Sequence, residues 1–267
     1  MDKRPIGMFD SGVGGMTVFS KLIKELPNED VIYFGDTKRF PYGNKSKESI
    51  ISISKQAVEF LISKNVKYII IACGTATSQA LEELKRIYKI PIIGIINPTV
   101  EYIKEHENLK NIGVIATRGT IKSNAWEKKI KEKIKDINVI NRECPVLADI
   151  AEQGWTDNKI AKLILEEYLI GMENIDALIL GCTHYPLFKN KIQEILGKSI
   201  ELIDTGEKLS IYLKKELEKL EITAVTNNIP KYEFYLSDTE SNFTKVANKL
   251  LDGSYNIEEN DIKRVEF

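Results

Sequence analysis

The sequence predicts an α/β protein of two similar units, each a mostly parallel sheet flanked by helices. Apolar, mostly β-branched runs at 68–73 and 177–182 each end in a cysteine followed closely by a threonine, which is typical of buried parallel strands. Strand-like and helix-like segments alternate along the chain, and right-handed crossovers between such strands produce a parallel sheet. Because two such runs end in the same way, the sequence also predicts that the chain consists of two related halves.

The first half opens with a buried strand at 6–10, a glycine-rich turn at 11–15 and an amphipathic helix at 16–26. Strand, turn and helix in this order are the start of an α/β unit. A second strand is predicted at 31–35, and it leads into the loop 36–43.

The next segments continue the alternation. Ser46 is expected to cap a long helix, because the apolar residues after it recur at helical spacing. The strand at 68–73 comes next, followed by a helix through Leu81 and Leu84 and a short strand at 92–95.

The pattern restarts in the second half, where strands are predicted at 111–117, 177–182 and 200–204. Gly119 is expected to open one helix that reaches about Ile134. Asp157 is expected to cap a second helix over 159–169, since aspartate is a favourable N-cap residue.

Spacing along the chain favours an internal duplication. Gly7 and Gly113 are separated by nearly the same number of residues as Cys73 and Cys182. Any two α/β units share the order strand, turn, helix, so chance similarity is the alternative explanation. The spacing alone does not decide between duplication and chance.

The C-terminal tail is expected to form a helix at about 208–220, a strand at 232–236 and a helix through Phe243 and Leu250. It is too short for a typical separate domain and is expected to fold back on the first unit. The predicted domains are therefore 1–97 together with 208–267, and 98–207.

Composition restricts the class of protein. The chain of 267 residues has 38 Lys+Arg against 39 Asp+Glu, which gives a net charge of -1. A protein with so small a net charge has no overall electrostatic field that would attract nucleic acid or an anionic membrane. No signal-peptide core follows the N-terminus, and no apolar run approaches the roughly 20 residues that span a bilayer. We expect a cytoplasmic protein that acts on a small molecule, with no nucleic-acid or membrane partner.

Cysteine usage indicates free thiols. Three widely spaced cysteines with no CxxC pair, and two histidines in all, argue against a disulfide framework and against a structural metal site. In a reducing compartment these thiols are available for chemistry or for packing.

Cys73 and Cys182 are the strongest candidates for chemistry. Both lie at carboxyl ends of predicted parallel strands, where open α/β sheets bind ligands. A single buried cysteine is more often a small apolar residue. Two at matched strand ends favour a shared site, because a thiolate acts as a base or nucleophile.

Two further residues are expected beside the thiols. His184, two positions beyond Cys182, is placed to assist ionisation of that thiol, and Asp10 ends the first strand on the Cys73 side. This pairing suits one sulfur that removes a proton and another that donates one. For Asp10 the alternative is a cap over the turn at 12–15, which does not exclude a role in the site.

Other motifs point less strongly to function. The turn 11–15 fits no nucleotide signature, although its amides could bind an anion. Pro41-Tyr42-Gly43 is a turn whose amides could receive a carboxylate, and Lys38 and Arg39 beside it are expected to be solvated.

Two residues of the second half have weaker assignments. Cys144 is not part of an apolar run like those of the other cysteines and is expected to be structural. Glu152 is either a surface carboxylate on a short helix or a support for the catalytic residues.

Taken together, these motifs resemble those of the cofactor-independent glutamate racemases. The matching segments follow family order over nearly the whole chain: Phe9-Asp-Ser-Gly-Val-Gly-Gly15, Asp36…Pro41-Tyr-Gly43, Ala72-Cys73-x-Thr75, Cys144-Pro145…Glu152-x-Gly154 and Gly181-Cys-Thr-His-Tyr-Pro-Leu187. The resemblance implies two α/β domains related by pseudo-two-fold symmetry, with the active site in the cleft between them.

The resemblance also implies an activity: L- and D-glutamate are interconverted without a cofactor or metal, and D-glutamate is supplied for peptidoglycan. Cys73 and Cys182 are then the two bases on opposite faces of the substrate α-carbon, with Asp10, His184 and Glu152 as further catalytic candidates. Expected substrate contacts are Asp10, Ser11, Pro41, Tyr42, Gly43, Gly74, Thr75, Thr117, Thr183 and His184. Dimers of the family vary in arrangement, and a homodimer is one expected assembly.

Gly74 departs from the family pattern, which usually has asparagine after the first cysteine. A hydrogen bond to a charged group contributes about 1.5–3 kcal/mol, so losing the amide predicts activity roughly ten- to a hundredfold weaker. Compensation by a backbone amide or water is one alternative. Others are a racemase of another acidic amino acid such as aspartate, or a non-catalytic amino-acid-binding paralogue.

Overall fold

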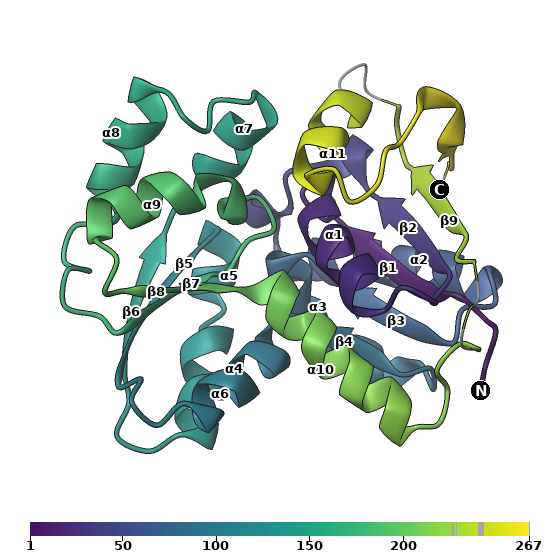
Figure 1. The fold of residues 1–267 in the computed structure, drawn as a ribbon, viewed down its shortest axis with the longest axis horizontal. Helices are drawn as coiled ribbons and strands as arrows, with labels where there is room; N and C mark the ends of the chain where they lie inside the picture. Colours follow the sequence, from purple (N-terminus) through teal and green to yellow (C-terminus); the bar gives the residue numbers. More distant parts are fainter. Residues whose placement is uncertain (226, 228, 240–242, 267) are drawn as a thin grey trace.

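The structure, a computed structural model, contains two parallel sheets side by side, each flanked by helices (Figure 1). It describes residues 1–225, 227, 229–239 and 243–266. The predicted α/β class with two mostly parallel sheets is confirmed.

The first sheet has the strand order β10-β9-β2-β1-β3-β4, and all its pairs are parallel. Its strands are β1 (Ile6–Asp10), β2 (Val31–Gly35), β3 (Tyr68–Ile71), β4 (Ile92–Gly94), β9 (Tyr232–Leu236) and β10 (Ile262–Arg264). The tail strand β9 pairs with β2, with Val31 opposite Tyr232. The tail thus extends the sheet of the first half.

The second sheet has the order β6-β5-β7-β8, again with parallel pairs throughout. Its strands are β5 (Asn111–Ala116), β6 (Asn138–Glu143), β7 (Ala177–Leu180) and β8 (Glu201–Asp204). The first four strands of the chain are ordered in the same way, as β2-β1-β3-β4. Equal topology is what an internal duplication produces, while domain boundaries at 97/98 and 207/208 stay a prediction.

Helices cover the faces of both sheets (Figure 1). They are α1 (Met16–Glu25), α2 (Lys47–Ser63), α3 (Gly74–Ile87), α4 (Ile96–Glu105), α5 (Arg118–Lys122), α6 (Ala125–Lys133), α7 (Leu147–Glu152), α8 (Lys159–Tyr168), α9 (Lys189–Leu196), α10 (Thr205–Lys219) and α11 (Phe243–Leu251). Ser46 caps α2 as predicted, accepting a hydrogen bond from the Ser49 amide at 3.2 Å.

Two helix predictions are wrong in detail. The single helix expected from Gly119 to Ile134 is divided into α5 and α6, because Asn124 lies in the left-handed region with φ of 55°. Asn158, not Asp157, caps α8, and its side chain accepts from the Ala161 amide at 2.8 Å. Both residue types favour N-caps, so the sequence did not separate them.

Strands β6 and β10 were missed by the sequence analysis. β6 is polar and only half-buried at the edge of its sheet, and β10 is short and largely exposed. Neither has the apolar signal on which strand prediction depends. Since β6 ends immediately before Cys144, that cysteine also follows a strand.

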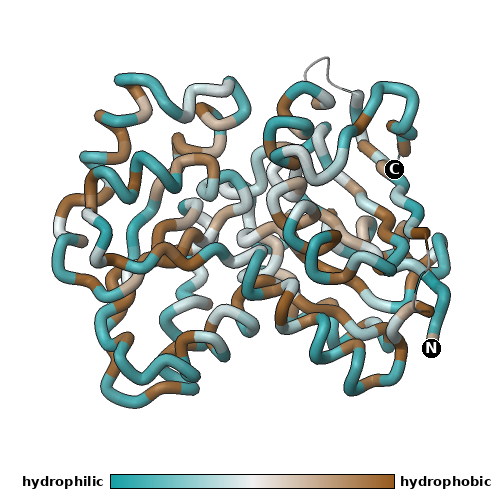
Figure 2. The backbone as a smooth tube through the Cα atoms, viewed as in Figure 1, coloured by the Kyte–Doolittle hydropathy of each residue, from teal (hydrophilic) through white to brown (hydrophobic). Residues whose placement is uncertain are grey.

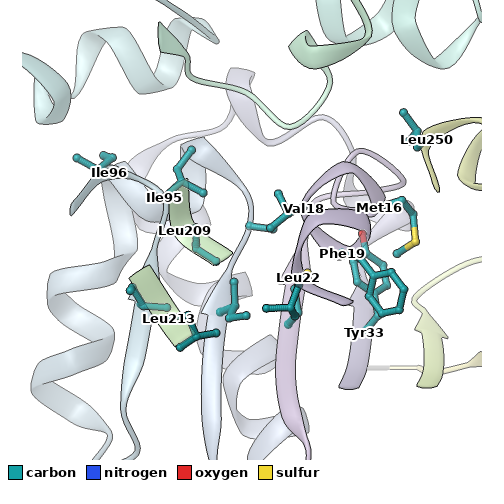
Figure 3. Packing of buried hydrophobic residues seen from close by; sticks show 14 of the residues in the cluster. Met16, Val18, Phe19, Leu22, Tyr33, Ile95, Ile96, Leu209, Leu213 and Leu250 are labelled. Atoms are coloured by element: carbon teal, nitrogen blue, oxygen red, sulfur yellow. The ribbon is translucent and has the colours of Figure 1, made fainter. Parts of the chain in front are cut away.

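Buried hydrophobic residues of both halves form one continuous cluster on the side of α1, α4 and α10. Helix α10 follows β8 and packs against α1 of the first half and against α4, which contacts α6 of the second half. Figure 3 shows Val18 and Leu22 of α1 near Leu209 and Leu213 of α10. Apolar segments accordingly concentrate in the interior, and hydrophilic ones on the outer helices (Figure 2).

Among the described residues no helix is both long and apolar enough to cross a bilayer. Within the same ranges, no group of three or more His, Cys, Asp or Glu side chains is arranged to hold a metal ion.

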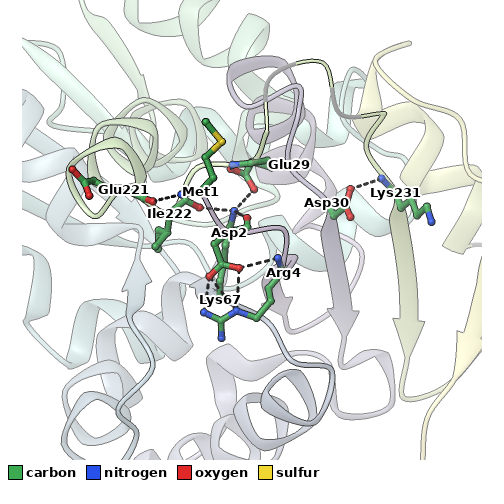
Figure 4. A network of polar contacts seen from close by, with 10 residues as sticks. Met1, Asp2, Arg4, Glu29, Asp30, Lys67, Glu221, Ile222 and Lys231 are labelled. Carbon is green, nitrogen blue, oxygen red and sulfur yellow. Dashed lines mark hydrogen bonds and ion pairs between the residues drawn. The ribbon is translucent and has the colours of Figure 1, made fainter.

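A buried ion pair fastens the N-terminus and the tail to the first sheet. The Lys67 Nζ lies 2.6 Å from a Glu29 carboxylate oxygen, and both side chains are nearly inaccessible to solvent. The same ammonium donates to the carbonyl oxygens of Asp2 at 2.9 Å and Ile222 at 2.7 Å (Figure 4). The other Glu29 oxygen accepts from the Ala224 amide at 2.7 Å.

Lys67→Met is expected to lower the free energy of unfolding by about 3–5 kcal/mol, because it leaves the Glu29 carboxylate buried without its cation. The double variant Lys67→Met/Glu29→Leu removes both charges and is expected to lose less. Urea-induced unfolding followed by circular dichroism measures the difference. A double variant less stable than the single one would contradict this account.

Candidate active site

The cysteines Cys73 and Cys182 hold equivalent places in the two sheets. Strand β3 ends two residues before Cys73, and β7 ends two residues before Cys182. Each of these strands neighbours the first strand of its half, β1 or β5. Cys73 is the N-cap residue of α3, so the thiol stands where the strand turns into the helix.

Both thiols line one pocket between the halves. All predicted site residues except Asp10 and Glu152 line it: Ser11, Pro41, Tyr42, Gly43, Cys73, Gly74, Thr75, Thr117, Cys182, Thr183 and His184. Asp10 and Glu152 lie immediately behind the lining and contact Thr183 and His184 respectively. The structure therefore brings the predicted residues together, and their roles stay predictions.

Three lining residues were missed from the sequence: Phe40, Ala148 and Gly181. Phe40 and Gly181 adjoin Pro41 and Cys182, so adjacency to a motif was the available signal. Ala148 lies on the short helix α7, and no sequence feature distinguishes it.

Cys73 is buried beside an acid. Removal from solvent raises the pKa of its thiol to about 12, and the negative charge of Asp10 adds to the effect. Hydrogen bonds from the Ala76 amide and the Ser11 hydroxyl act in the opposite direction. The thiol is therefore protonated at neutral pH.

Cys182 is buried beside an imidazole that is held by an acid. The Sγ lies 3.8 Å from His184 Nδ1, and His184 Nε2 lies 3.0 Å from Glu152 Oε1. Burial by itself lowers the pKa of His184, but hydrogen bonds to Cys182 and Glu152 outweigh it and raise the pKa above its ordinary value. Glu152 thus holds a cationic imidazole against the sulfur, and the reading of it as a simple surface carboxylate is wrong.

Asp10 is fully buried at the end of β1. Its Oδ2 accepts from the amides of Gly12 at 3.3 Å and Gly15 at 2.9 Å, so the predicted cap over the turn is present. The Thr183 hydroxyl donates to the same oxygen at 3.5 Å. Burial raises the pKa of Asp10 to about 6, despite the lowering effects of the His184 charge and the amides. Its Oδ1 has no hydrogen-bond partner among the described residues.

Three threonine hydroxyls join the halves on the other side of the pocket. Thr75 Oγ1 lies 2.9 Å from Thr117 Oγ1, which lies 2.9 Å from Thr120 Oγ1. These hydroxyls bond to one another rather than to the thiols. Because Thr75 follows β3 and Thr117 follows β5, the bond fixes the strand ends of both halves together.

The loop after β2 is braced by a carboxylate. Asp36 Oδ2 accepts from the Tyr42 hydroxyl at 2.5 Å and from Arg39 Nε at 2.7 Å. Arg39 was expected to be solvated, but it forms an ion pair with the buried Asp36. Lys38 is exposed as expected. The bracing fixes Tyr42 and Gly43 in the wall of the pocket.

Two glycines let the halves approach at the pocket. A Cβ at Gly74 would overlap the carbonyl oxygen of Gly181, which is backbone and cannot rotate away. A Cβ at Gly14 would meet the Thr183 hydroxyl at 2.5 Å and would overlap the His184 ring. Close approach, not a positive φ, is what requires glycine at both positions.

Cys144 lies outside the pocket, in the hydrophobic cluster of the second half. Burial raises the pKa of its thiol, and its Sγ lies 3.8 Å from the Arg142 carbonyl oxygen. This surrounding suits the structural role predicted for it.

Comparison with known proteins gives a consistent result. The sequence profile of the family described as Asp/Glu/Hydantoin racemase matches residues 7–209. A glutamate racemase of Lactococcus lactis subsp. cremoris is 42% identical over 265 residues, which cover 98% of each chain.

Similar solved structures are also glutamate racemases. A Francisella tularensis glutamate racemase in complex with D-glutamate superposes with a TM-score of 0.91 at 39% identity, covering 100% of this chain and 98% of that one. A glutamate racemase isoform of Bacillus anthracis gives a TM-score of 0.93 at 36% identity and the same coverage. The resemblance noted from the motifs is confirmed, and the chain belongs to the Asp/Glu/Hydantoin racemase family.

Proposed function

We propose that this chain is a glutamate racemase that inverts the α-carbon by exchanging its proton between Cys73 and Cys182. The observation that carries the proposal is that two thiols from equivalent strand ends of two halves line one pocket. Inversion requires a proton to leave one face of the α-carbon and another to arrive on the opposite face. A pair of carriers on opposite walls meets that requirement.

The surroundings of the two sulfurs differ. The cationic His184 imidazole lies against the Cys182 sulfur, whereas Cys73 beside Asp10 keeps its proton. In one direction the Cys182 thiolate removes the α-proton, and the Cys73 thiol donates its proton to the other face of the carbanion. The reverse direction starts with the protons exchanged, so no net proton is gained or lost.

The α-carbanion is far more basic than a thiolate and must be stabilised within the pocket. Pre-arranged dipoles in a site that excludes water supply such stabilisation. The first amides of α3 at Gly74 and Thr75 have no intrahelical acceptor and suit a carboxylate of the substrate. The Oδ1 of Asp10, which has no hydrogen-bond partner among the described residues, suits the substrate ammonium.

Gly74 bears on substrate choice and on the alternatives. In this chain the backbone of Gly181 occupies the space that an asparagine Cβ would need. Glycine at position 74 thus allows the backbones of the two halves to approach at this point. Relatives that are 40–42% identical to this chain are glutamate racemases, which does not favour an aspartate racemase or a non-catalytic binding protein.

D-glutamate from this reaction would supply peptidoglycan synthesis. A cytoplasmic location and a homodimer are parts of the same proposal. All proton carriers in the scheme come from the chain itself.

Cys73→Ala and Cys182→Ala are each expected to lower racemisation by more than about a thousandfold, because one face loses its proton carrier. The remaining thiol still reaches one face, so each variant should exchange the α-proton of only one enantiomer, and the two variants should differ in which. Circular dichroism and NMR of L- and D-glutamate in deuterated water measure both effects.

Cys144→Ala is the matched control and should keep wild-type racemisation. Full activity in either pocket variant would refute the two-base scheme. No α-proton exchange by the wild-type protein on glutamate or aspartate would refute catalysis altogether.

The pH profile should report Asp10. Its pKa of about 6 predicts that kcat/KM falls about tenfold per pH unit below about pH 6, as protonation removes the charge that holds the substrate ammonium. The groups that face this carboxyl are His184, Thr183 and Cys73. Their charges and hydrogen bonds are expected to respond when Asp10 is protonated. Asp10→Asn should lower kcat/KM at neutral pH and abolish this acid limb. Persistence of the limb in Asp10→Asn would assign it to another group.

The raised pKa of Asp10 also affects folding stability, but in the opposite direction: low pH, which is expected to reduce activity, favours the fold. A carboxyl whose folded-state pKa is raised stabilises the fold below its unfolded pKa, and this contribution is lost as pH rises through about 6. Asp10→Asn should therefore gain more stability at pH 8 than at pH 4, measured by urea unfolding.

Gly74→Asn is expected to lower kcat/KM at least about tenfold, because the new Cβ pushes the halves apart at the pocket. Gly74→Ala should act in the same direction. Gly7→Ala is the control: its Cβ meets only side-chain ends of Val66 and Leu61 at 3.1 and 3.2 Å, so it should affect stability but not kcat/KM. Higher activity in Gly74→Asn would show instead that the missing amide limits the enzyme.

A further inference from the structure

Phe40 is shared by two cavities. It lines the pocket that holds both thiols, and it also lines a neighbouring outer pocket. The outer pocket is formed by Gly12, Val13 and Thr37 of the first half, Glu152 of α7, and Phe243 and Val246 of α11. Figure 1 shows α7 and α11 at the same end of the molecule. The ring of Phe40 therefore lies between the thiol pocket and this outer space.

The ring is held between the halves by contacts that involve no polar bond. Its centroid lies 5.6 Å from that of His184, and it packs against the hydrophobic cluster of the second half. On the other side it faces Gly12, where an added Cβ would come within 3.1 Å of Phe40 Cδ2. Rotation about the side-chain torsions would break no hydrogen bond of the ring.

The other walls of the thiol pocket are less able to move. Gly74 and Gly181 meet through backbone, and Thr75 is hydrogen-bonded to Thr117. The backbone beside Phe40 is itself fixed, because Asp36 binds both Arg39 and Tyr42. Phe40 combines partial exposure to solvent with a side chain free of polar bonds.

We propose that Phe40 is the gate of the catalytic pocket: its ring excludes water and reagents from both thiols, and its rotation admits substrate from the outer pocket. The substrate part of this proposal rests on the proposed racemase function. The shielding of the thiols does not, since it follows from the position of the ring. Phe40 thereby determines access, and it takes no part in proton transfer.

Alkylation tests the gate without turnover. The full-length protein is treated with N-ethylmaleimide, and modification of Cys73, Cys182 and Cys144 is followed separately by peptide mass spectrometry. In Phe40→Ala both pocket thiols are expected to react at least about tenfold faster than in the wild type, because the rate scales with the open fraction. Cys144, which lines neither pocket, serves as the internal reference for global unfolding.

Phe243→Ala is the matched control, because Phe243 lines the outer pocket only. It should leave both pocket thiols near their wild-type rates. Phe40→Trp should slow both reactions. Glutamate added to the wild type should protect both thiols; loss of this protection alone would count against the racemase function and not against the gate.

Wild-type rates at both thiols in Phe40→Ala would overturn the proposal. Acceleration at Cys182 alone would also overturn it, since that result indicates a displaced His184 rather than an open pocket. If Cys144 accelerates as well, the variant has loosened globally, and Phe40→Leu then decides by the same criterion.

Discussion

The site depends on how closely the backbone of one half approaches that of the other at the carboxyl ends of the strands. Gly74 lies against the carbonyl of Gly181, and Gly14 lies against Thr183 and His184. One methyl group at either position would displace groups that line the pocket. Misplacement of reacting groups by about 1 Å can lower a rate a hundredfold. The spacing of the two thiols is therefore set by the absence of side chains at these contacts, as much as by the side chains present.

The two halves share a topology but not an electrostatic environment. Strands β3 and β7 present Cys73 and Cys182 in the same way, each beside the first strand of its half. Around Cys73 the nearby charge is the Asp10 carboxylate, and around Cys182 it is an imidazolium held by Glu152. Two halves of equal topology thus supply two equivalent positions, while the side chains around them place an acid beside one thiol and an imidazole beside the other. The two halves are alike in where their strands place the cysteines, and they differ in the charged groups beside each cysteine.

The sequence predicted the parts of the fold that have a local signal. Strand β9 and helix α2 follow from apolar periodicity and a serine cap, and both are observed where expected. Strand β6 could not be predicted in this way, because an edge strand with polar residues lacks the apolar run. In the site, the strand-end cysteines and His184 were predictable from spacing. The Glu152–His184 contact and the position of Phe40 were not, because they bring together segments far apart in the chain.

The surroundings of Cys73 and Cys182 differ, yet the reaction that the pocket is proposed to catalyse must run equally well in both directions. L- and D-glutamate have equal free energies in water, so kcat/KM must be the same in both directions of a racemase. A thiolate at Cys73 forms from a thiol whose pKa is raised, and the enantiomer that uses this enzyme form carries that population cost. Part of the cost comes from the Asp10 charge, which raises the pKa of Cys73. A substrate ammonium bound to Asp10 would neutralise this charge and lower the pKa of the Cys73 thiol. In the proposed scheme, Asp10 therefore reduces the population cost at Cys73 at the moment when the substrate occupies the pocket.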